Sequence, residues 1–218
     1  MVFGSLRSGI RNFMIITDSN NNVYFGGNQS WFPYRFLKNS GCGVIAAAEL
    51  LLKLCGRETI DKLEYMEFAT ELWKHFLPVI PGFGMNGLTL ASGLNRYFWK
   101  NKMPYRAFWC ASDRKMVRRI HQMLKEDMPV ILSIGPNFPM FWRGEKLTFY
   151  RKVNDTFMAA VKTKAHFVTV TGWEGRMIQI SSWGKEYYID YGEYRDYVKK
   201  HSCPLVSNIV YVKKIKKE

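Results

Sequence analysis

The chain has 218 residues, of which 47% are hydrophobic and 16% are aromatic. This apolar content excludes a disordered chain and is enough for one sizeable domain with a hydrophobic core. The net charge of +14 favours anionic partners. No recognition motif accompanies the basic residues, however, so the charge by itself does not predict nucleic-acid binding.

Sequence signals for a membrane span, a secretory leader or a metal site are not visible. No apolar run approaches the roughly 18 residues that a membrane span needs, so we expect no membrane span and a cytoplasmic protein. The cysteines are Cys42, Cys55, Cys110 and Cys203, and their spacing matches no zinc motif. We therefore expect reduced thiols, no metal and no organic cofactor.

The first half of the chain is predicted to be mainly helical. The expected elements are short strands at 13–16 and 23–25, helices at 42–56, 59–76 and 88–99, a strand at 105–109, and a helix capped by Ser112 or Asp113. The helix at 42–56 organises this half, because its residues are almost wholly apolar and predict a buried central helix. Thr59 is the expected cap of the next helix.

From Pro129 onward the pattern changes to strands. They are expected at 130–134, 166–173, 177–181, about 185–189 and 206–213, with an extended excursion at 146–160 and a helix from the Asp190/Glu193 capping box to Lys199. Helices first and strands later predict an α+β fold. We expect a single domain over 1–218, with a mainly helical half at about 30–128 packed on a mainly antiparallel β half at 129–218.

Cys42 is the first candidate for chemistry. A small turn, Gly41-Cys42-Gly43, delivers it to the first turn of the central helix. Amide groups at a helix N-terminus favour negative charge, so a cysteine there is expected to have a lowered pKa and more of the nucleophilic thiolate. The alternative is a small cysteine that only packs at a helix start.

His166 is the best candidate for a base to act on that thiol. It begins a strand of the second half and can face the N-terminus of the central helix across a cleft. An imidazolium would lower the pKa of Cys42, and the thiolate would raise the pKa of His166, so the two predict an ion pair. A satisfied structural histidine is the alternative.

Five segments carry a family resemblance. They are Gly41-Cys42-Gly43-Val44, the residues 84–89, the residues 124–131, His166 with the strand to Trp173, and Ser181-Ser182-Trp183-Gly184. In this order they resemble the papain-like cysteine peptidases, especially the bacteriocin-processing (double-glycine leader) type and its bacterial relatives. The resemblance covers roughly residues 30–200. It implies a papain-like fold and thiol-dependent hydrolysis of a peptide or protein substrate in a cleft between the halves.

The resemblance also implies roles for individual residues. Cys42 would be the nucleophile and His166 the general base. Ser181 takes the third position, where the family has Asn or Asp, and a serine hydroxyl orients and stabilises an imidazolium less firmly. Trp183 matches a tryptophan that shields the histidine from water. The cleft walls are expected to include Trp31, Phe32, Phe141 and Trp142, with core packing as the alternative.

The oxyanion position departs from the family pattern. The family has a glutamine shortly before the cysteine, and Phe36 stands there. Asn39 is the nearest amide side chain, and it is expected to act with the Cys42 backbone N–H. By sequence Gln29 is too far before Cys42 to contribute unless an extended loop brings it back. Two further functions stay open: a weak or inactive domain of the same fold that binds a peptide or glycan, and, less favoured, a thiol acyltransferase.

Overall fold

The computed structural model describes residues 7–110, 113–135, 146–203, 205 and 207–215. The helices are η1 (Gln29–Trp31), α1 (Arg35–Ser40), α2 (Cys42–Leu54), α3 (Lys62–His75), α4 (Gly87–Lys100), α5 (Asp113–Lys125) and α6 (Tyr191–His201). The strands are β1 (Arg7–Gly9), β2 (Ile15–Thr17), β3 (Val23–Phe25), β4 (Thr59–Asp61), β5 (Tyr105–Trp109), β6 (Val130–Ile134), β7 (Leu147–Val153), β8 (Thr156–Thr163), β9 (His166–Glu174), β10 (Met177–Ser182), β11 (Lys185–Asp190) and β12 (Ile209–Lys214). The expected mixture of helices and sheet is confirmed.

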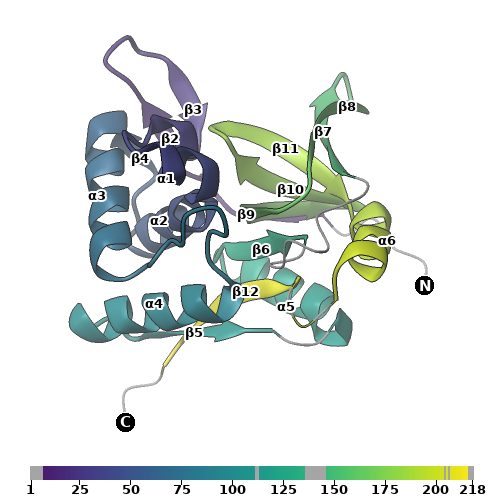
Figure 1. Cartoon of the computed structure of the whole chain (residues 1–218). Helices are drawn as coiled ribbons and strands as arrows, with labels where there is room; N and C mark the ends of the chain where they lie inside the picture. Colours follow the sequence, from purple (N-terminus) through teal and green to yellow (C-terminus); the bar gives the residue numbers. More distant parts are fainter. Residues whose placement is uncertain (1–6, 111–112, 136–145, 204, 206, 216–218) are drawn as a thin grey trace.

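Most strands belong to one antiparallel sheet (Figure 1). Its order is β5-β12-β6-β9-β10-β11-β7-β8, and β1 also pairs with β9. The register places Ile134 of β6 opposite His166 and Ser181 of β10 opposite Thr169. Strand β9, which begins with His166, therefore lies between β6 and β10. A smaller sheet, β3-β2-β4, lies beside the helices.

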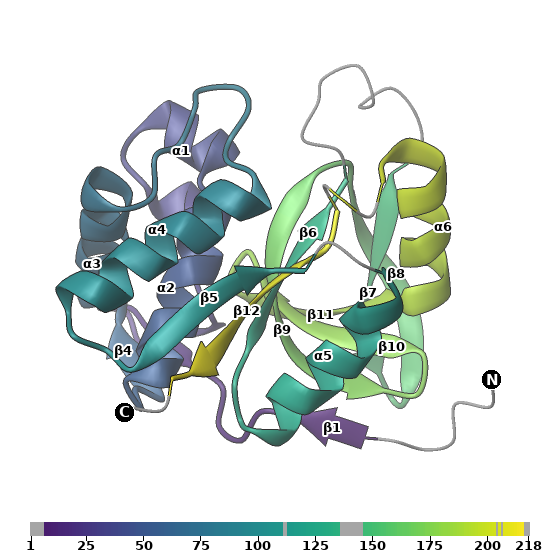
Figure 2. The same cartoon turned by 90° about the horizontal axis from the view of Figure 1, so that it is seen from below.

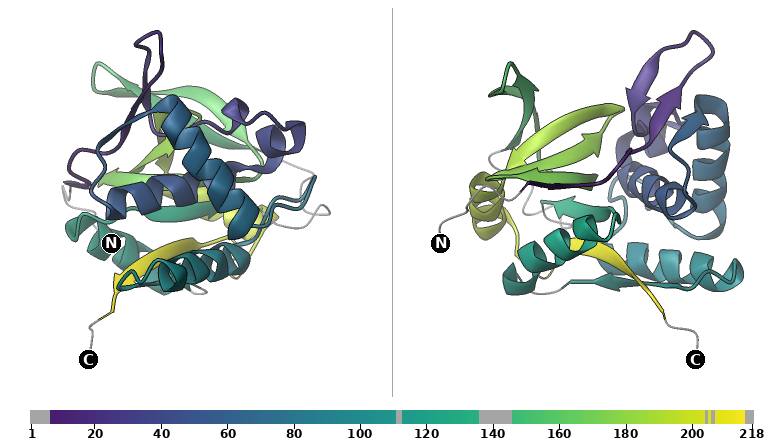
Figure 3. Two further views of the ribbon diagram at one scale, coloured as in Figure 1. Left: turned by 90° about the vertical axis from the view of Figure 1, so that its left-hand side faces the viewer. Right: turned by 180° about the vertical axis from the view of Figure 1, so that it is seen from behind.

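Helices α1 to α4 form a layer on one side of the molecule, and the main sheet with α5 and α6 forms the other (Figure 2). Figure 3 (left) shows the helical layer in front of the sheet. Helix α2 packs directly on β9, and every residue from Gly43 to Lys53 is buried. The burial follows from the run of alanine and leucine in this helix, because apolar side chains on all faces need packing partners on all faces. Thus α2 is the central helix that the sequence predicts.

The packing boundary differs from the sequence boundary at residue 129. Helix α5 lies in the part predicted to be mainly helical (about 30–128), yet Met116, Ile120 and Met123 belong to the core on the sheet side. Strand β5 also comes from the predicted helical part, and it pairs with β12 at the edge of the main sheet. The sequence pattern assigns elements locally, whereas each core is defined by which apolar faces meet.

Several element boundaries are corrected by the structure. Thr59 begins β4, which pairs in parallel with β2, and the cap of α3 is instead Asp61, whose carboxylate accepts from the Leu63 amide at 2.7 Å. The excursion at 146–160 forms the β7–β8 hairpin. The last strand begins at Ile209, and α1 and β1 are elements that the sequence analysis did not predict. Strand β1 pairs with the distant strand β9, and that pairing leaves no pattern in its own three residues.

Candidate active site

Cys42 is the first residue of α2 and lies half-buried where the helix begins. The glycines around it allow close packing. A Cβ on Gly43 would lie 2.8 Å from the Met85 sulfur, and one on Gly41 would lie 2.5 Å from the Leu37 carbonyl oxygen. Both separations are shorter than van der Waals contact, so a larger residue would press on the α1 backbone at position 41 and on the Met85 side chain at position 43. The two glycines therefore fix where the thiol lies.

His166 is the first residue of β9, and only 8% of its surface is exposed. It lines a cleft of ≈310 Å³ together with Cys42. The rest of the cleft is lined by Asn39, Ser40, Gly82, Phe83, Gly84, Met85, Ser133, Ile134, Lys164, Ala165 and Phe167. The structure therefore brings the thiol and the imidazole, which are 124 residues apart in the sequence, to one cleft between the layers.

The protonation of this pair differs from the expected ion pair. Burial raises the pKa of Cys42, and the opposing hydrogen bonds from the backbone of Phe167, Gly43 and Cys42 itself only partly offset it. Burial also lowers the pKa of His166 to about 3. Both changes favour the uncharged form, because a desolvated charge is costly. The pair is thus a neutral thiol and a neutral imidazole at pH 7, and the predicted lowered pKa of Cys42 is corrected.

The imidazole of His166 is held on two sides. Its Nε2 lies 2.8 Å from the hydroxyl oxygen of Ser182. The Trp183 ring stacks on it, with ring centres 4.5 Å apart and planes 19° apart. This stacking places Trp183 where the family resemblance implies a shielding tryptophan.

The residue next to the imidazole nitrogen is Ser182 and not Ser181, which corrects the sequence assignment. The Ser181 hydroxyl lies instead 2.8 Å from Glu49 Oε1 and 3.1 Å from the Phe25 carbonyl oxygen, which are the two acceptors for its one proton. Consecutive side chains of a strand point in opposite directions, so only one of the two serines can reach His166. The sequence motif supplies both serines and does not indicate which of them faces the ring.

Two amide side chains lie near Cys42. Asn39, the predicted oxyanion residue, is exposed and lines the ≈310 Å³ cleft. Gln29 shares a second, small cavity with Cys42 and His166, and its Nε2 donates to the Lys38 carbonyl at 2.7 Å. The sequence analysis placed Gln29 too far back because it did not predict α1. That helix turns the chain around and returns Lys38 to Gln29.

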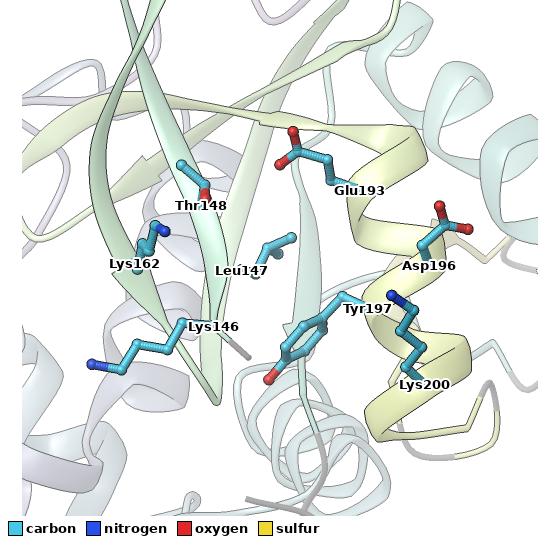
Figure 4. Close-up of a pocket in the computed structure, with 8 residues that line it drawn as sticks. All are labelled: Lys146, Leu147, Thr148, Lys162, Glu193, Asp196, Tyr197 and Lys200. Carbon is cyan, nitrogen blue, oxygen red and sulfur yellow. The ribbon is translucent and has the colours of Figure 1, made fainter. Parts of the chain in front are cut away.

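A larger hollow of ≈660 Å³ lies between the β7–β8 hairpin and α6 (Figure 4). Its lining is Lys146, Leu147, Thr148, Lys162, Glu193, Asp196, Tyr197 and Lys200. One of its carboxylates, Glu193, accepts a hydrogen bond from Tyr150 at 2.6 Å. Neither Cys42 nor His166 lines this hollow, so the nucleophile candidate belongs to the smaller cleft.

The aromatic residues predicted to form the cleft walls do not line the cleft in the described part of the structure. Phe32 is fully buried in the core and is not a wall residue, which corrects that prediction. Trp31 packs against Tyr24 and lines neither the cleft nor the small cavity. Phe141 and Trp142 lie outside the described residues.

Within the described residues, no group of three or more histidine, cysteine or acidic side chains is placed to hold a metal ion. No helix in the same part of the chain has the length and apolar character to cross a membrane.

A helical layer that presents a cysteine and an antiparallel sheet that presents a histidine define a mixed helix-and-sheet protein with a thiol–imidazole cleft. A solved structure from Bacillus anthracis, described as a "putative C39-like peptidase", has a similar fold, with a TM-score of 0.54 and 14% sequence identity. The match covers 97% of this chain and 100% of the other. Scans of protein-family models and of curated proteins give no match. The likeness shows a shared fold over nearly the whole chain.

Proposed function

We propose that this protein is a thiol-dependent hydrolase of the papain-like cysteine peptidase class that cleaves a peptide or amide bond. One observation carries the proposal: Cys42 at the start of α2 and His166 at the start of β9 line the same cleft. The fold shared with a protein described as a C39-like peptidase supports it. The proposal includes a single papain-like domain over 1–218.

In the proposed first step the neutral imidazole acts as a general base. With Nε2 engaged by Ser182, a proton on Nε2 leaves the lone pair of Nδ1 to accept the thiol proton. The Cys42 sulfur then bonds to the substrate carbonyl carbon, and the imidazolium returns its proton to the leaving amine as the C–N bond breaks. Water, deprotonated by the same imidazole, attacks the thioester, which releases the acid and restores the thiol.

The developing oxyanion needs hydrogen-bond donors in the cleft. We assign the Cys42 backbone N–H as one donor. The side-chain donor is Asn39 or Gln29, since both lie in cavities that Cys42 also lines. Trp183 covers the imidazole and keeps water from one face. Among the described cleft residues, none singles out a double-glycine leader, so the proposed substrate class remains a peptide or amide.

A peptide-like electrophile tests the proposal, with the labelled cysteine located by mass spectrometry. We expect labelling at Cys42 that is abolished in Cys42→Ala and reduced by about 100-fold or more in His166→Ala, because the base removes the thiol proton. Cys55 and Cys203 are exposed thiols, so Cys55→Ala and Cys203→Ala are matched controls that should keep the labelling.

The same experiment separates the other functions. Labelling that is slow at every cysteine and indifferent to His166→Ala, together with capture of a peptide or glycan, would indicate a binding domain and contradict the proposal. Consumption of an added amine in place of water would indicate an acyltransferase that uses the same thiol.

A further inference from the structure

Glu49 is a buried acid for which the proposed mechanism has no role. It lies on α2 seven residues after Cys42, which is two helical turns along the same face. Its exposure is 1%, in a helix that is otherwise mainly apolar. A buried carboxyl group is costly unless it is hydrogen-bonded, so its partners indicate what keeps it there.

The partners of Glu49 come from two other elements of the site. Its Oε1 accepts from the backbone N–H of Gly27 at 2.7 Å and from the Ser181 hydroxyl at 2.8 Å. Gly27 lies two residues before Gln29, and Ser181 is followed by Ser182, the partner of His166. One carboxyl oxygen therefore joins the cysteine helix to the loop that leads to Gln29 and to the strand of Ser182.

The backbone at Gly26 packs closely against Glu49 and Ser181. A Cβ on Gly26 would lie 2.2 Å from Glu49 Oε1 and 2.1 Å from the Ser181 hydroxyl oxygen. Gly26 has φ +73°, a conformation that favours glycine. The loop can thus approach the carboxyl only because residue 26 has no side chain.

Glu49 also reaches the reacting groups through a shared space. A cavity of ≈10 Å³ is lined by Glu49, Cys42, His166, Gln29 and Ser182, among others. This is about the volume that one water-sized probe needs. Glu49 therefore lines a cavity that Cys42 and His166 also line.

We infer that Glu49 is a positioning residue that fixes the Gln29 loop and the Ser182 strand against α2, and that its ionisation strengthens the site. The inference rests on the proposed function. A carboxylate accepts stronger hydrogen bonds from the same two donors than a carboxylic acid does.

The titration of Glu49 falls in an accessible range. Burial raises its pKa to about 7, although the hydrogen bonds it accepts, including those from Gly27 and Ser181, oppose the rise. The titratable groups that face it are Tyr65 of α3, whose pKa is raised by burial and by Glu49, and Cys42 and His166 across the cavity. In the part of the chain that the structure describes, no lysine or arginine forms an ion pair with it.

The test compares Glu49→Gln with the wild type across pH 5.5–8.5, using turnover of a peptide substrate and reporting kcat and KM separately. Glutamine keeps an acceptor oxygen but does not ionise. We expect the kcat ratio of variant to wild type to stay within about twofold at pH 6 and to fall about tenfold by pH 8, with KM unchanged. Taking the ratio cancels the titration of Cys42, which both proteins share.

Two further variants keep the result interpretable. Ser181→Ala removes one donor to the carboxylate, so the midpoint of its kcat profile should move above that of the wild type. Glu67→Gln changes an exposed acid on α3 and should leave the profile unchanged. If Glu49→Gln does not fold, as judged by circular dichroism, the Ser181→Ala midpoint decides.

The failures are distinguishable. A kcat ratio that is constant with pH, or a Ser181→Ala midpoint that does not move, overturns the role of Glu49 while Cys42-dependent turnover of the wild type upholds the hydrolase. Turnover that does not depend on Cys42 overturns the proposed function and the role of Glu49 with it.

Discussion

Two of the hollows in the described part of this protein differ in a way that bears on function. The hollow of ≈660 Å³ beside α6 is larger than the cleft, and the lysines that line it, Lys146, Lys162 and Lys200, are exposed. The ≈310 Å³ cleft is smaller, and it contains a half-buried thiol and a buried imidazole. Water screens the exposed lysines of the hollow more than it screens the buried imidazole of the cleft. Burial, rather than size, therefore distinguishes the candidate active site.

The largest expected effect is at the thiol. Cys42→Ser changes one atom and keeps the side-chain shape, but a hydroxyl is a far weaker nucleophile beside a neutral imidazole. We expect turnover of a peptide substrate to fall by about 1000-fold or more. Stopped-flow or endpoint peptide assays measure it, with Cys55→Ser as the control. Turnover within tenfold of the wild type would place the chemistry elsewhere.

The next effect concerns stability rather than rate. Glu49 has a folded-state pKa of about 7 against 4.5 unfolded. The folded protein therefore binds more protons between these values, so this contribution to stability is complete below pH 4.5 and is lost as pH rises towards 7. The loss is at most about 3 kcal/mol. Urea unfolding at pH 4.5 and 7.5 should show it in the wild type relative to Glu49→Gln.

The buried imidazole has the opposite pH dependence over an overlapping range. The folded-state pKa of His166 is lowered to about 3, so stability is lost as pH falls through 6.5 towards 3. For this reason, the difference between wild type and Glu49→Gln is the informative quantity, because the His166 contribution cancels in it. A difference that does not change with pH would contradict the burial-raised pKa of Glu49.

A smaller effect is expected where the cleft meets water. Trp183→Ala removes the ring that stacks on His166, so water should reach the imidazole and its pKa should rise towards the ordinary value of about 6.5. NMR of the His166 ring signals measures the change. Trp99→Ala removes an exposed tryptophan and is the matched control. An unchanged His166 titration would show that Trp183 does not shield the ring.

The smallest effect is expected in the larger hollow. Replacing Lys146, Lys162 and Lys200 together by alanine removes exposed charges that solvent already screens. Turnover of a neutral peptide should change by less than about threefold. A loss comparable with that of Cys42→Ser would show that the hollow takes part in the reaction and would remove the distinction between the two cavities.

Residues whose role depends on local pattern were predictable. The alanine and leucine residues after Cys42 predict a buried helix, and the structure buries α2 from Gly43 to Lys53. The alternation after His166 predicts the strand that becomes β9. The strands at 105–109 and 130–134 have the predicted bounds, because each is a short apolar run with clear breaks.

Two kinds of residue could not be predicted: those whose role depends on which way the side chain points, and those that a turn of the chain brings back to the site. Ser181 and Ser182 are adjacent in sequence, and only the orientation of β10 decides that Ser182 reaches His166. Gln29 comes near Cys42 because the unpredicted helix α1 turns the chain. In the sequence Glu49 only interrupts an apolar run, although in the structure it joins three elements.

The sequence by itself determined a basic chain with a cysteine at the start of an apolar helix and a histidine at the start of a strand, since periodicity is a local property. Only the tertiary structure decided that the two share a cleft, that burial favours the neutral thiol and the neutral imidazole, and that a buried glutamate lines a cavity with both of them. The physical reason is desolvation: the free energy of a charge depends on what surrounds it, and the surroundings come from packing of distant segments.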